Sequence, residues 1–203
     1  MGVPAKRRSY HHGELRAALV DTAVELIAER GVHAFSLAEA ARRLGVTVAA
    51  PYRHFADRGD LLAAVAVRAT EALAARLRTL PDRLPPEERL VDAAEAYVRF
   101  AAEERALFDA LFAAGVDKAR HPELAAATDG VLAVLAEPAL ALSDGDRERA
   151  ETLVLSLAGA AHGSAALLLD GGLCQDPEAV DHAVRKARAL ARALIHGRRH
   201  LVC

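Results

Sequence analysis

The sequence predicts an all-α protein, with a three-helix domain at its amino end and a larger helical domain after it. Apolar residues recur at spacings of three and four along most of the chain, whereas the strict alternation of a half-buried strand is nearly absent. Alanine and leucine dominate the composition, and proline or glycine separates the periodic stretches. With 53% hydrophobic and 27% charged residues, the chain has the composition of a soluble globular protein.

The first predicted helix ends at Gly31 and carries one apolar stripe, formed by Leu15, Leu19, Ala23, Leu26 and Ile27. A second, short helix follows from Ser36, whose side chain can cap it while Glu39 reciprocates, as in a capping box. Gly45 can adopt the positive φ that ends a helix and lets the chain reverse. The first helix is expected to brace the two shorter ones in one small core.

The residues after Gly45 predict a third helix, capped by Thr47. Pro51 stands about one turn into this helix, where a proline removes at most one backbone hydrogen bond. Phe55 is expected to turn inward. The exposed side is then formed by Val48, Ala49, Ala50, Tyr52, Arg53 and His54. Two short helices joined in this way predict a helix-turn-helix, whose second helix enters the DNA major groove.

A fourth helix is predicted to start at Asp57, with Asp60 three residues on, and to run toward Leu80, where prolines interrupt it. Beyond them we expect helices at about 87–103, 105–114, 122–141, 144–170 and 177–196. Pro138 should kink or end one of these helices. Ser143 with Asp146 resembles a capping box, and Asp176 before Pro177 predicts another helix start.

The stretch SLAEAARRLGVTVAAPYRHF and its flanks, YHHGELRAALVDTAVELIAERG and ADRGDLLAAVAVRA, resemble the DNA-binding end of tetracycline-repressor-family (TetR) transcriptional regulators. The resemblance covers about the first third of the chain and includes Tyr52, His54, Phe55, Arg58 and the Leu61–Leu62 helix start. Pro51 departs from it, because the family usually has a helix-forming apolar residue there. The implied domains are a flexible basic arm (1–9), a helix-turn-helix domain (10–60), a connecting helix (61–80) and an effector-binding and dimerisation domain (81–203).

The resemblance implies a repressor that binds a palindromic operator as a homodimer and is released by an apolar small molecule. The candidate DNA-binding residues are Ser36, Thr47, Val48, Ala49, Ala50, Tyr52, Arg53, His54 and Arg58. Tyr52, His54 and Arg58 could contact phosphate. Arg53 could read guanine through O6 and N7, and the methyl groups of residues 47–50 suit thymine. The alternative is that Tyr52 is a half-buried core residue and His54 an ordinary exposed polar one.

Charge supports nucleic-acid binding only weakly. Residues 1–60 carry nine lysines and arginines against seven acidic residues, and residues 61–203 carry 17 against 21. The basic arm with Lys6, Arg7 and Arg8 could lie along phosphate or be a solvated tail. The adjacent His11 and His12 point apart on a helix, so they do not form a metal site.

Tyr97, Phe100, Phe108, Phe112 and His162 are candidates for an effector pocket, although packing in a core explains aromatic residues at helical spacing better. His162 stands in an otherwise apolar helix and needs a hydrogen-bond partner if it is buried. Its AHG motif resembles one in the carboxy-terminal domain of a TetR subgroup, the WHG type.

The last two predicted helices carry apolar stripes wider than one small domain can hide. Small residues there allow two copies to pair as a four-helix bundle about a twofold axis. The candidate interface residues are Leu155, Gly159, His162, Gly163, Ala166, Leu167, Val184, Ala187, Leu190, Ala191 and Leu194. The alternative is an intramolecular core.

Other functional classes find little support. A hydrolase using Ser164 or Cys174 with His162 would need a hydroxyl or thiol aimed at the imidazole, and a serine two residues along the same helix is not. A helical interaction module without DNA affinity is a further alternative. We expect no metal or cofactor, no disulfide framework from Cys174 and Cys203, no signal peptide or membrane span, and a cytoplasmic location.

Overall fold

The computed structural model of the protein describes residues 12–112, 119–172 and 178–201, which form eight α-helices and two short 3-10 helices, with no strand among them. The all-α prediction is therefore confirmed. The chain divides into two compact units. The amino-terminal unit comprises Met1–Ala69 and Ala106–Ala125, and the carboxy-terminal unit comprises Thr70–Arg105 and Ala126–Cys203.

In the amino-terminal unit, α1 (His12–Arg30) and α2 (Leu37–Leu44) are followed by the 3-10 helix η1 (Pro51–Arg53) and the start of α3 (Arg58–Arg78). Their core is formed by Leu19, Leu26, Ile27, Leu37, Phe55 and Leu61, all nearly inaccessible to water. The short helix α5 (Arg105–Leu111) buries Leu107, Phe108 and Ala110 in the same unit. Apolar burial of this kind is the main favourable term in folding.

Ion pairs tie α1 to α2. Arg43 donates to both carboxylate oxygens of Glu29, over 2.7 and 2.6 Å, which holds the pKa of that carboxyl below its usual value. Glu39 lies 2.5 Å from the Arg30 guanidinium. Glu39 was predicted to reach back to Ser36, but its carboxylate pairs with α1 instead.

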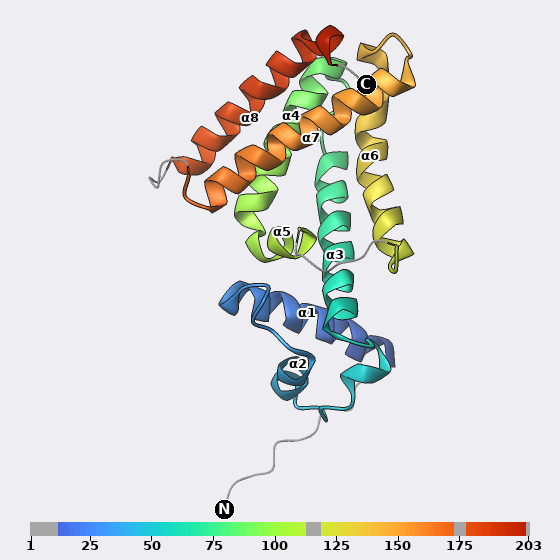
Figure 1. Cartoon of the computed structure of the whole chain (residues 1–203), viewed down its shortest axis with the longest axis vertical. Coiled ribbons are helices and arrows are strands. Elements are labelled where there is room, and N and C mark those ends of the chain that lie inside the picture. The colour runs from blue at the N-terminus through green and yellow to red at the C-terminus, as the bar shows by residue number, and fades with distance from the viewer. Residues whose placement is uncertain (1–11, 113–118, 173–177, 202–203) are drawn as a thin grey trace, which may run out of the picture. The chain divides into compact units, whose positions relative to one another are not determined.

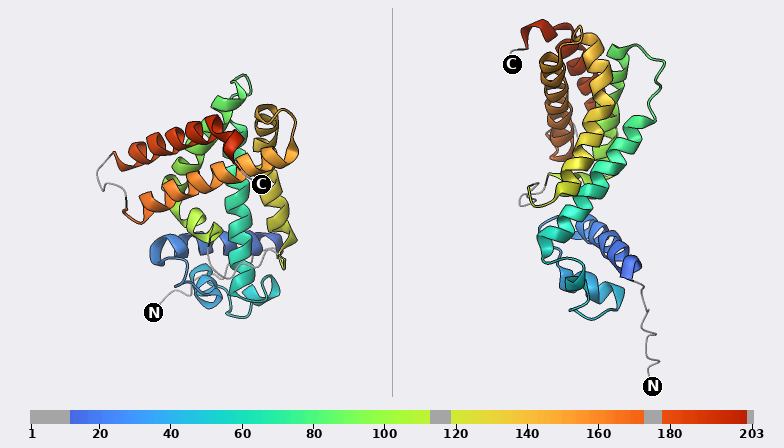
Figure 2. Two further views of the ribbon diagram at one scale, coloured as in Figure 1. Left: turned by 45° about the horizontal axis from the view of Figure 1, so that its top comes forward. Right: turned by 90° about the vertical axis from the view of Figure 1, so that its right-hand side faces the viewer.

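The carboxy-terminal unit is built around α4 (Pro86–Glu103), α7 (Arg147–Leu169) and α8 (Ala179–His196), each of which packs on the other two (Figure 1). Figure 2 shows the same packing from two further sides. Arg188 of α8 donates to Asp92 and Glu95 of α4, each over 2.6 Å. A short 3-10 helix, η2 (Arg198–His200), follows α8.

The later helices follow the predictions closely, with two differences. α6 (Pro122–Leu142) continues past the buried Pro138, so the helix does not end there, and the alternative of a kink at Pro138 stays a prediction. α7 begins after Asp146, whose side chain accepts from the Arg149 amide over 3.2 Å. Ser143 was expected to cap this helix, but Asp144 and Gly145 adopt positive φ and turn the chain before it starts. The predicted cap at Asp176 lies outside the described residues.

Candidate nucleic-acid interface

Helix α2 is fixed at both ends by its own sequence. The Ser36 side chain accepts from the Glu39 amide over 3.2 Å, as predicted. At the other end Gly45 has φ 71°, and the amides of Gly45 and Val46 bond to the carbonyls of Arg42 and Ala41. This paired arrangement satisfies the last carbonyls and turns the chain sharply. The residues after Gly45 are thereby presented at the surface.

The third predicted helix is not an α-helix. The Ala50 amide bonds to the Thr47 carbonyl over 2.9 Å, and Arg53 and His54 bond back three residues to Ala50 and Pro51. Because Pro51 has no N–H, the bond that would join it to Thr47 in an α-helix cannot form. The segment therefore folds as successive tight turns around η1, and the predicted cap by Thr47 is replaced by Ala50, which makes no side-chain cap.

This segment has an outer and an inner side. Pro51 and Phe55 are buried, and Phe55 turns inward as predicted, with the guanidinium carbon of Arg16 5.3 Å from its ring centroid. Val48 and Tyr52 are 49% and 55% exposed. The alternative that Tyr52 is a half-buried core residue is therefore wrong. Thr47, Ala49 and Arg53 are exposed, whereas Ala50 and His54 are half-buried.

We call the exposed residues of this segment the turn surface; they are Thr47, Val48, Ala49, Tyr52 and Arg53. Within the described parts of the chain, the Arg53 guanidinium makes no hydrogen bond or ion pair. A cation beside a phenol and three methyl-bearing side chains can donate to phosphate or to a base edge and can contact thymine methyls. The turn surface thus carries the side chains that were predicted to contact DNA, but its backbone forms tight turns and a 3-10 helix where an α-helix was predicted.

Arg58 lies in a different environment from the one expected of a phosphate ligand. Its Nη2 donates to the Val32 carbonyl and its Nε to the Phe35 carbonyl over 3.2 Å. Its guanidinium carbon also lies 4.6 Å from the centroid of the Phe35 ring. Two of its three nitrogens therefore hold the loop between α1 and α2. The predicted phosphate contact stays a prediction.

The start of α3 is held by two aspartates. Asp57 accepts from the Asp60 amide and Asp60 from the Ala56 amide, each over 2.9 Å. Arg120 and His121, just before α6, place nitrogens 3.8 Å from Asp60 Oδ1. This contact could not be predicted from the sequence, because the two segments are about 60 residues apart and neither forms a known motif.

The five predicted pocket residues are divided between the two units. In the carboxy-terminal unit, Tyr97 Oη lies 3.2 Å from His162 Nδ1, which gives the half-buried imidazole a hydrogen-bond partner. Burial raises the pKa of the Tyr97 hydroxyl well above its usual range, which keeps that hydroxyl protonated. Phe100 is buried in α4. Phe108 and Phe112, with ring centroids 5.1 Å apart, belong to the amino-terminal unit.

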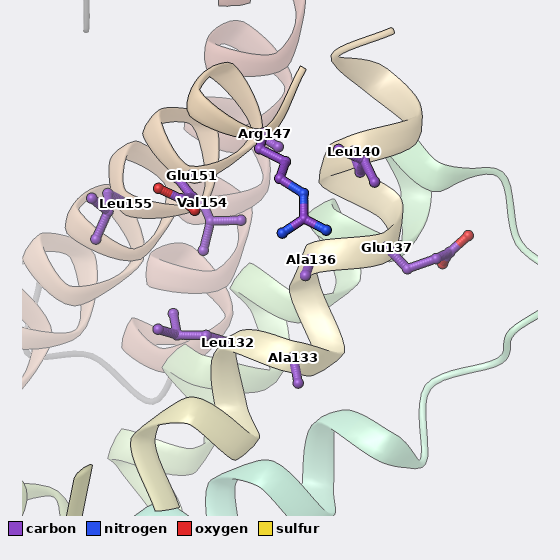
Figure 3. A pocket seen from close by; sticks show the side chains of 10 residues that line it. Leu132, Ala133, Ala136, Glu137, Leu140, Arg147, Glu151, Val154 and Leu155 are labelled. Atoms are coloured by element: carbon purple, nitrogen blue, oxygen red, sulfur yellow. The ribbon is translucent and has the colours of Figure 1, made fainter. Parts of the chain in front are cut away.

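Sequence reasoning missed a groove between α6 and α7, entirely within the carboxy-terminal unit (Figure 3). Its volume is about 540 Å³, and its walls include Leu132, Ala136, Arg147 and Leu155. Pockets of about 300–1,000 Å³ with mostly apolar walls are typical of small-molecule sites. The signal was available in part, because α6 is apolar over nearly its whole length.

The predicted dimer residues separate into two groups. Val184, Ala187 and Ala191 are at most 5% exposed, because this stripe of α8 packs inside its own protomer. These three residues are therefore not accessible to a partner subunit. Leu155, Leu167 and Leu190 are 67%, 52% and 46% exposed. The others are exposed or half-buried and can reach a partner; they are Gly159, His162, Gly163, Ala166 and Leu194.

The residues of the rival enzyme hypothesis do not form a catalytic group. The Ser164 hydroxyl is buried and donates to the Ala160 carbonyl over 2.9 Å, and Cys174 lies outside the described residues. No group of three metal-binding side chains occurs in the residues that the structure describes. The basic arm with Lys6, Arg7 and Arg8, and His11, lie outside these residues, and the His12 side chain is not described.

Two described helices, Pro122–Leu142 and Arg147–Leu169, are long and apolar enough to span a membrane by length and composition. Two such helices are weak evidence, because helices that pack in a soluble bundle have the same composition. The predicted absence of membrane contact stays a prediction.

Two family models match the chain. One, described as bacterial regulatory proteins of the tetR family, matches residues 19–65, and the other, a tetracyclin repressor-like carboxy-terminal domain, matches residues 90–191. The WHG-type subgroup stays a prediction. None of the curated proteins matches the sequence.

Solved structures match over nearly the whole chain. A protein of unknown function from Rhodococcus sp. RHA1 is 31% identical, with a TM-score of 0.71, and the match covers 92% of this chain and 98% of that one. A tetR-family transcriptional regulator from Streptomyces coelicolor is 25% identical, with a TM-score of 0.66, over 96% of this chain and 92% of that one. A TetR-like regulator from Rhodococcus sp. RHA1, at 20% identity and a TM-score of 0.66, shares the fold over 93% of this chain and its own full length.

Proposed function

This chain belongs to the TetR family of bacterial regulatory proteins, and on that premise we propose that it is a cytoplasmic, non-enzymatic repressor that binds a palindromic operator as a homodimer. The observation that carries the proposal is the turn surface. Its cation, Arg53, has no protein partner among the described residues and lies on the same segment as the exposed Tyr52 and Val48, which the buried Pro51 and Phe55 fix from below. Such pre-organisation keeps the entropic cost of binding low.

Each contact has a proposed role. Arg53 donates to guanine O6 and N7, and the methyl groups of Thr47, Val48 and Ala49 meet thymine. Tyr52 donates to phosphate, and the half-buried His54 and Ala50 support the segment. Ser36 contributes by fixing α2 through its cap. Because few side chains contact base edges, the protein would distinguish its operator from other DNA sequences through few hydrogen bonds.

The homodimer places two such surfaces on half-sites about one helical turn, roughly 34 Å, apart. A small apolar effector bound in the predicted domain 81–203, reached through the connecting helix 61–80, favours a conformation whose surfaces have the wrong spacing. The effector can shift this equilibrium only by its difference in affinity for the two conformations. Repression is then relieved without any covalent step.

The test is selection of bound duplexes from a random pool by the purified protein, followed by affinity measurements at several salt concentrations. We expect a recovered palindrome, and an affinity that falls steeply with salt because phosphate contacts release counterions. A pool that yields no enriched sequence and no salt-dependent binding would contradict the proposal. An interaction module without DNA affinity would give that result.

A further inference from the structure

The groove between α6 and α7 leaves apolar surface open to water. Only 17% of the most apolar window of α6 is buried within the protomer, and Leu132 is 39% exposed. Exposed apolar surface of this extent beside a groove marks a binding site for another molecule. The groove volume of about 540 Å³ suits a small molecule.

The groove adjoins a second, inner cavity. Leu132 lines both the groove and an apolar cavity of about 80 Å³ whose walls include Leu77, Tyr97 and Leu157. All of these residues belong to the carboxy-terminal unit. The Leu132 side chain is therefore part of the walls of both spaces, and the inner one also reaches Tyr97 of the Tyr97–His162 pair.

One cation faces this apolar site. Arg147 points between the two helices toward Ala136, and within the described residues its guanidinium has no hydrogen bond or ion pair (Figure 3). Two carboxylates are also near. Glu137 is turned away and pairs with Arg89, whereas Glu151 is exposed and solvated one turn further along α7.

We propose that this groove binds an elongated apolar molecule with a single carboxylate head. The head pairs with Arg147, and the tail lies along Leu132 and Val154 toward the inner cavity. This proposal rests on the proposed function, because the bound molecule would be the effector that releases the repressor from DNA. An arginine is suited to a carboxylate because its planar group donates two parallel hydrogen bonds. Apolar walls favour the tail in proportion to the area that it buries.

Calorimetric titration of the purified full chain with octanoate, decanoate and dodecanoate tests the groove directly. We expect binding that tightens by about fourfold for each added methylene. Dodecanol, which has the same tail and no charge, should bind at least tenfold more weakly than dodecanoate, since a hydrogen bond to a charged group exceeds a neutral one by about that factor. Equal affinity for the acid and the alcohol would overturn the proposal.

Three variants place the ligand. Arg147→Ala should lower dodecanoate affinity by about tenfold and leave dodecanol unchanged, and Arg147→Lys should restore part of the loss. Ala136→Phe should fill the groove and weaken both ligands. The matched control, Arg149→Ala, removes an exposed cation of the same helix that pairs with Asp146 and does not line the groove. Unaltered dodecanoate binding by Arg147→Ala or Ala136→Phe, with unchanged thermal unfolding, would overturn the assignment.

Failure of this inference is separable from failure of the DNA proposal. Arg147→Ala should bind the recovered operator normally without ligand, but dodecanoate should no longer release it at concentrations that release the wild-type protein. A protein that binds DNA and ignores dodecanoate would overturn the groove proposal alone. A protein that binds dodecanoate but no duplex would contradict the proposed function and leave the groove as a ligand site.

Discussion

Arg53 and Arg58 lie five residues apart and have opposite surroundings. Arg53 is exposed on the turn surface, whereas Arg58 is half-buried and bonds to the carbonyls of Val32 and Phe35. The sequence made both candidates for DNA contact, because the position of a carbonyl 23 or 26 residues earlier cannot be deduced from local spacing. Their substitution should therefore have different consequences.

Arg53→Ala should weaken operator binding and leave stability unchanged. Loss of a bidentate contact to guanine costs about 1–3 kcal/mol, which is roughly a 5- to 150-fold rise in Kd. Fluorescence anisotropy with the recovered duplex measures this change. Arg185→Ala, which removes an exposed cation of α8, is the matched control and should bind normally. Equal affinities for the two variants would remove Arg53 from the interface.

Arg58→Ala should instead lower the free energy of unfolding by about 1–3 kcal/mol, because two carbonyls lose a charged donor and Phe35 loses its cation. Urea denaturation measures the change, with Arg53→Ala as the control that should unfold like the wild type. A stability equal to that of the wild type would show that Arg58 does not hold the loop.

At the scale of elements, the sequence predicted the helices better than the backbone of the site. The caps at Ser36 and Gly45 are local and were predicted from a few neighbouring residues. Pro51 was expected to remove one bond from an α-helix, but the bonds of Ala50, Arg53 and His54 also span three residues, and only Phe55 bonds back four residues, to Pro51. α7 starts at Arg147, capped by Asp146, and not at residue 144 as predicted, because Asp144 and Gly145 adopt left-handed conformations.

The contacts between α4 and α8 predict a dependence of stability on acid. Burial alone would raise the pKa of Glu95, but hydrogen bonds from Arg99 and Arg188 outweigh it and hold that pKa below its ordinary value of 4.5. A carboxyl with a lowered pKa contributes stability that is present above pH 4.5 and is lost as the pH falls through the folded-state pKa.

Glu95→Gln should thus be less stable than the wild type at pH 7, and the difference should shrink as the pH falls below 4.5. Thermal unfolding at several pH values measures it. Glu71→Gln, which changes an exposed carboxylate of α3, is the control and should follow the wild type. A deficit that is the same at every pH would mean that Glu95 does not act through its charge.

At the scale of the whole molecule, the open apolar residues of α7 and α8 bear on assembly. Leu167 and Leu190 remain half exposed in the protomer, whereas the stripe with Ala187 and Ala191 is used inside it. The sequence could show that these helices are too apolar for one small domain. It could not show which apolar side of each helix packs inside the protomer and which faces outward, because both sides consist of alanine, valine and leucine.

Leu167→Glu should convert the proposed homodimer into a monomer, because a buried charge without a partner is costly. Light scattering after gel filtration measures the mass. Leu132→Glu, on α6, is the control and should remain a dimer. A Leu167→Glu protein that keeps the mass of the wild type would place the interface elsewhere.

Chemical protection of the recovered operator tests the central claim most directly, because dimethyl sulfate methylates guanine N7 in the major groove and adenine N3 in the minor groove. The account predicts protection of guanine N7 in two half-sites about one helical turn apart, and loss of that protection with Arg53→Ala at saturating protein. Protection confined to adenine N3, or a pattern that Arg53→Ala leaves intact, would contradict it.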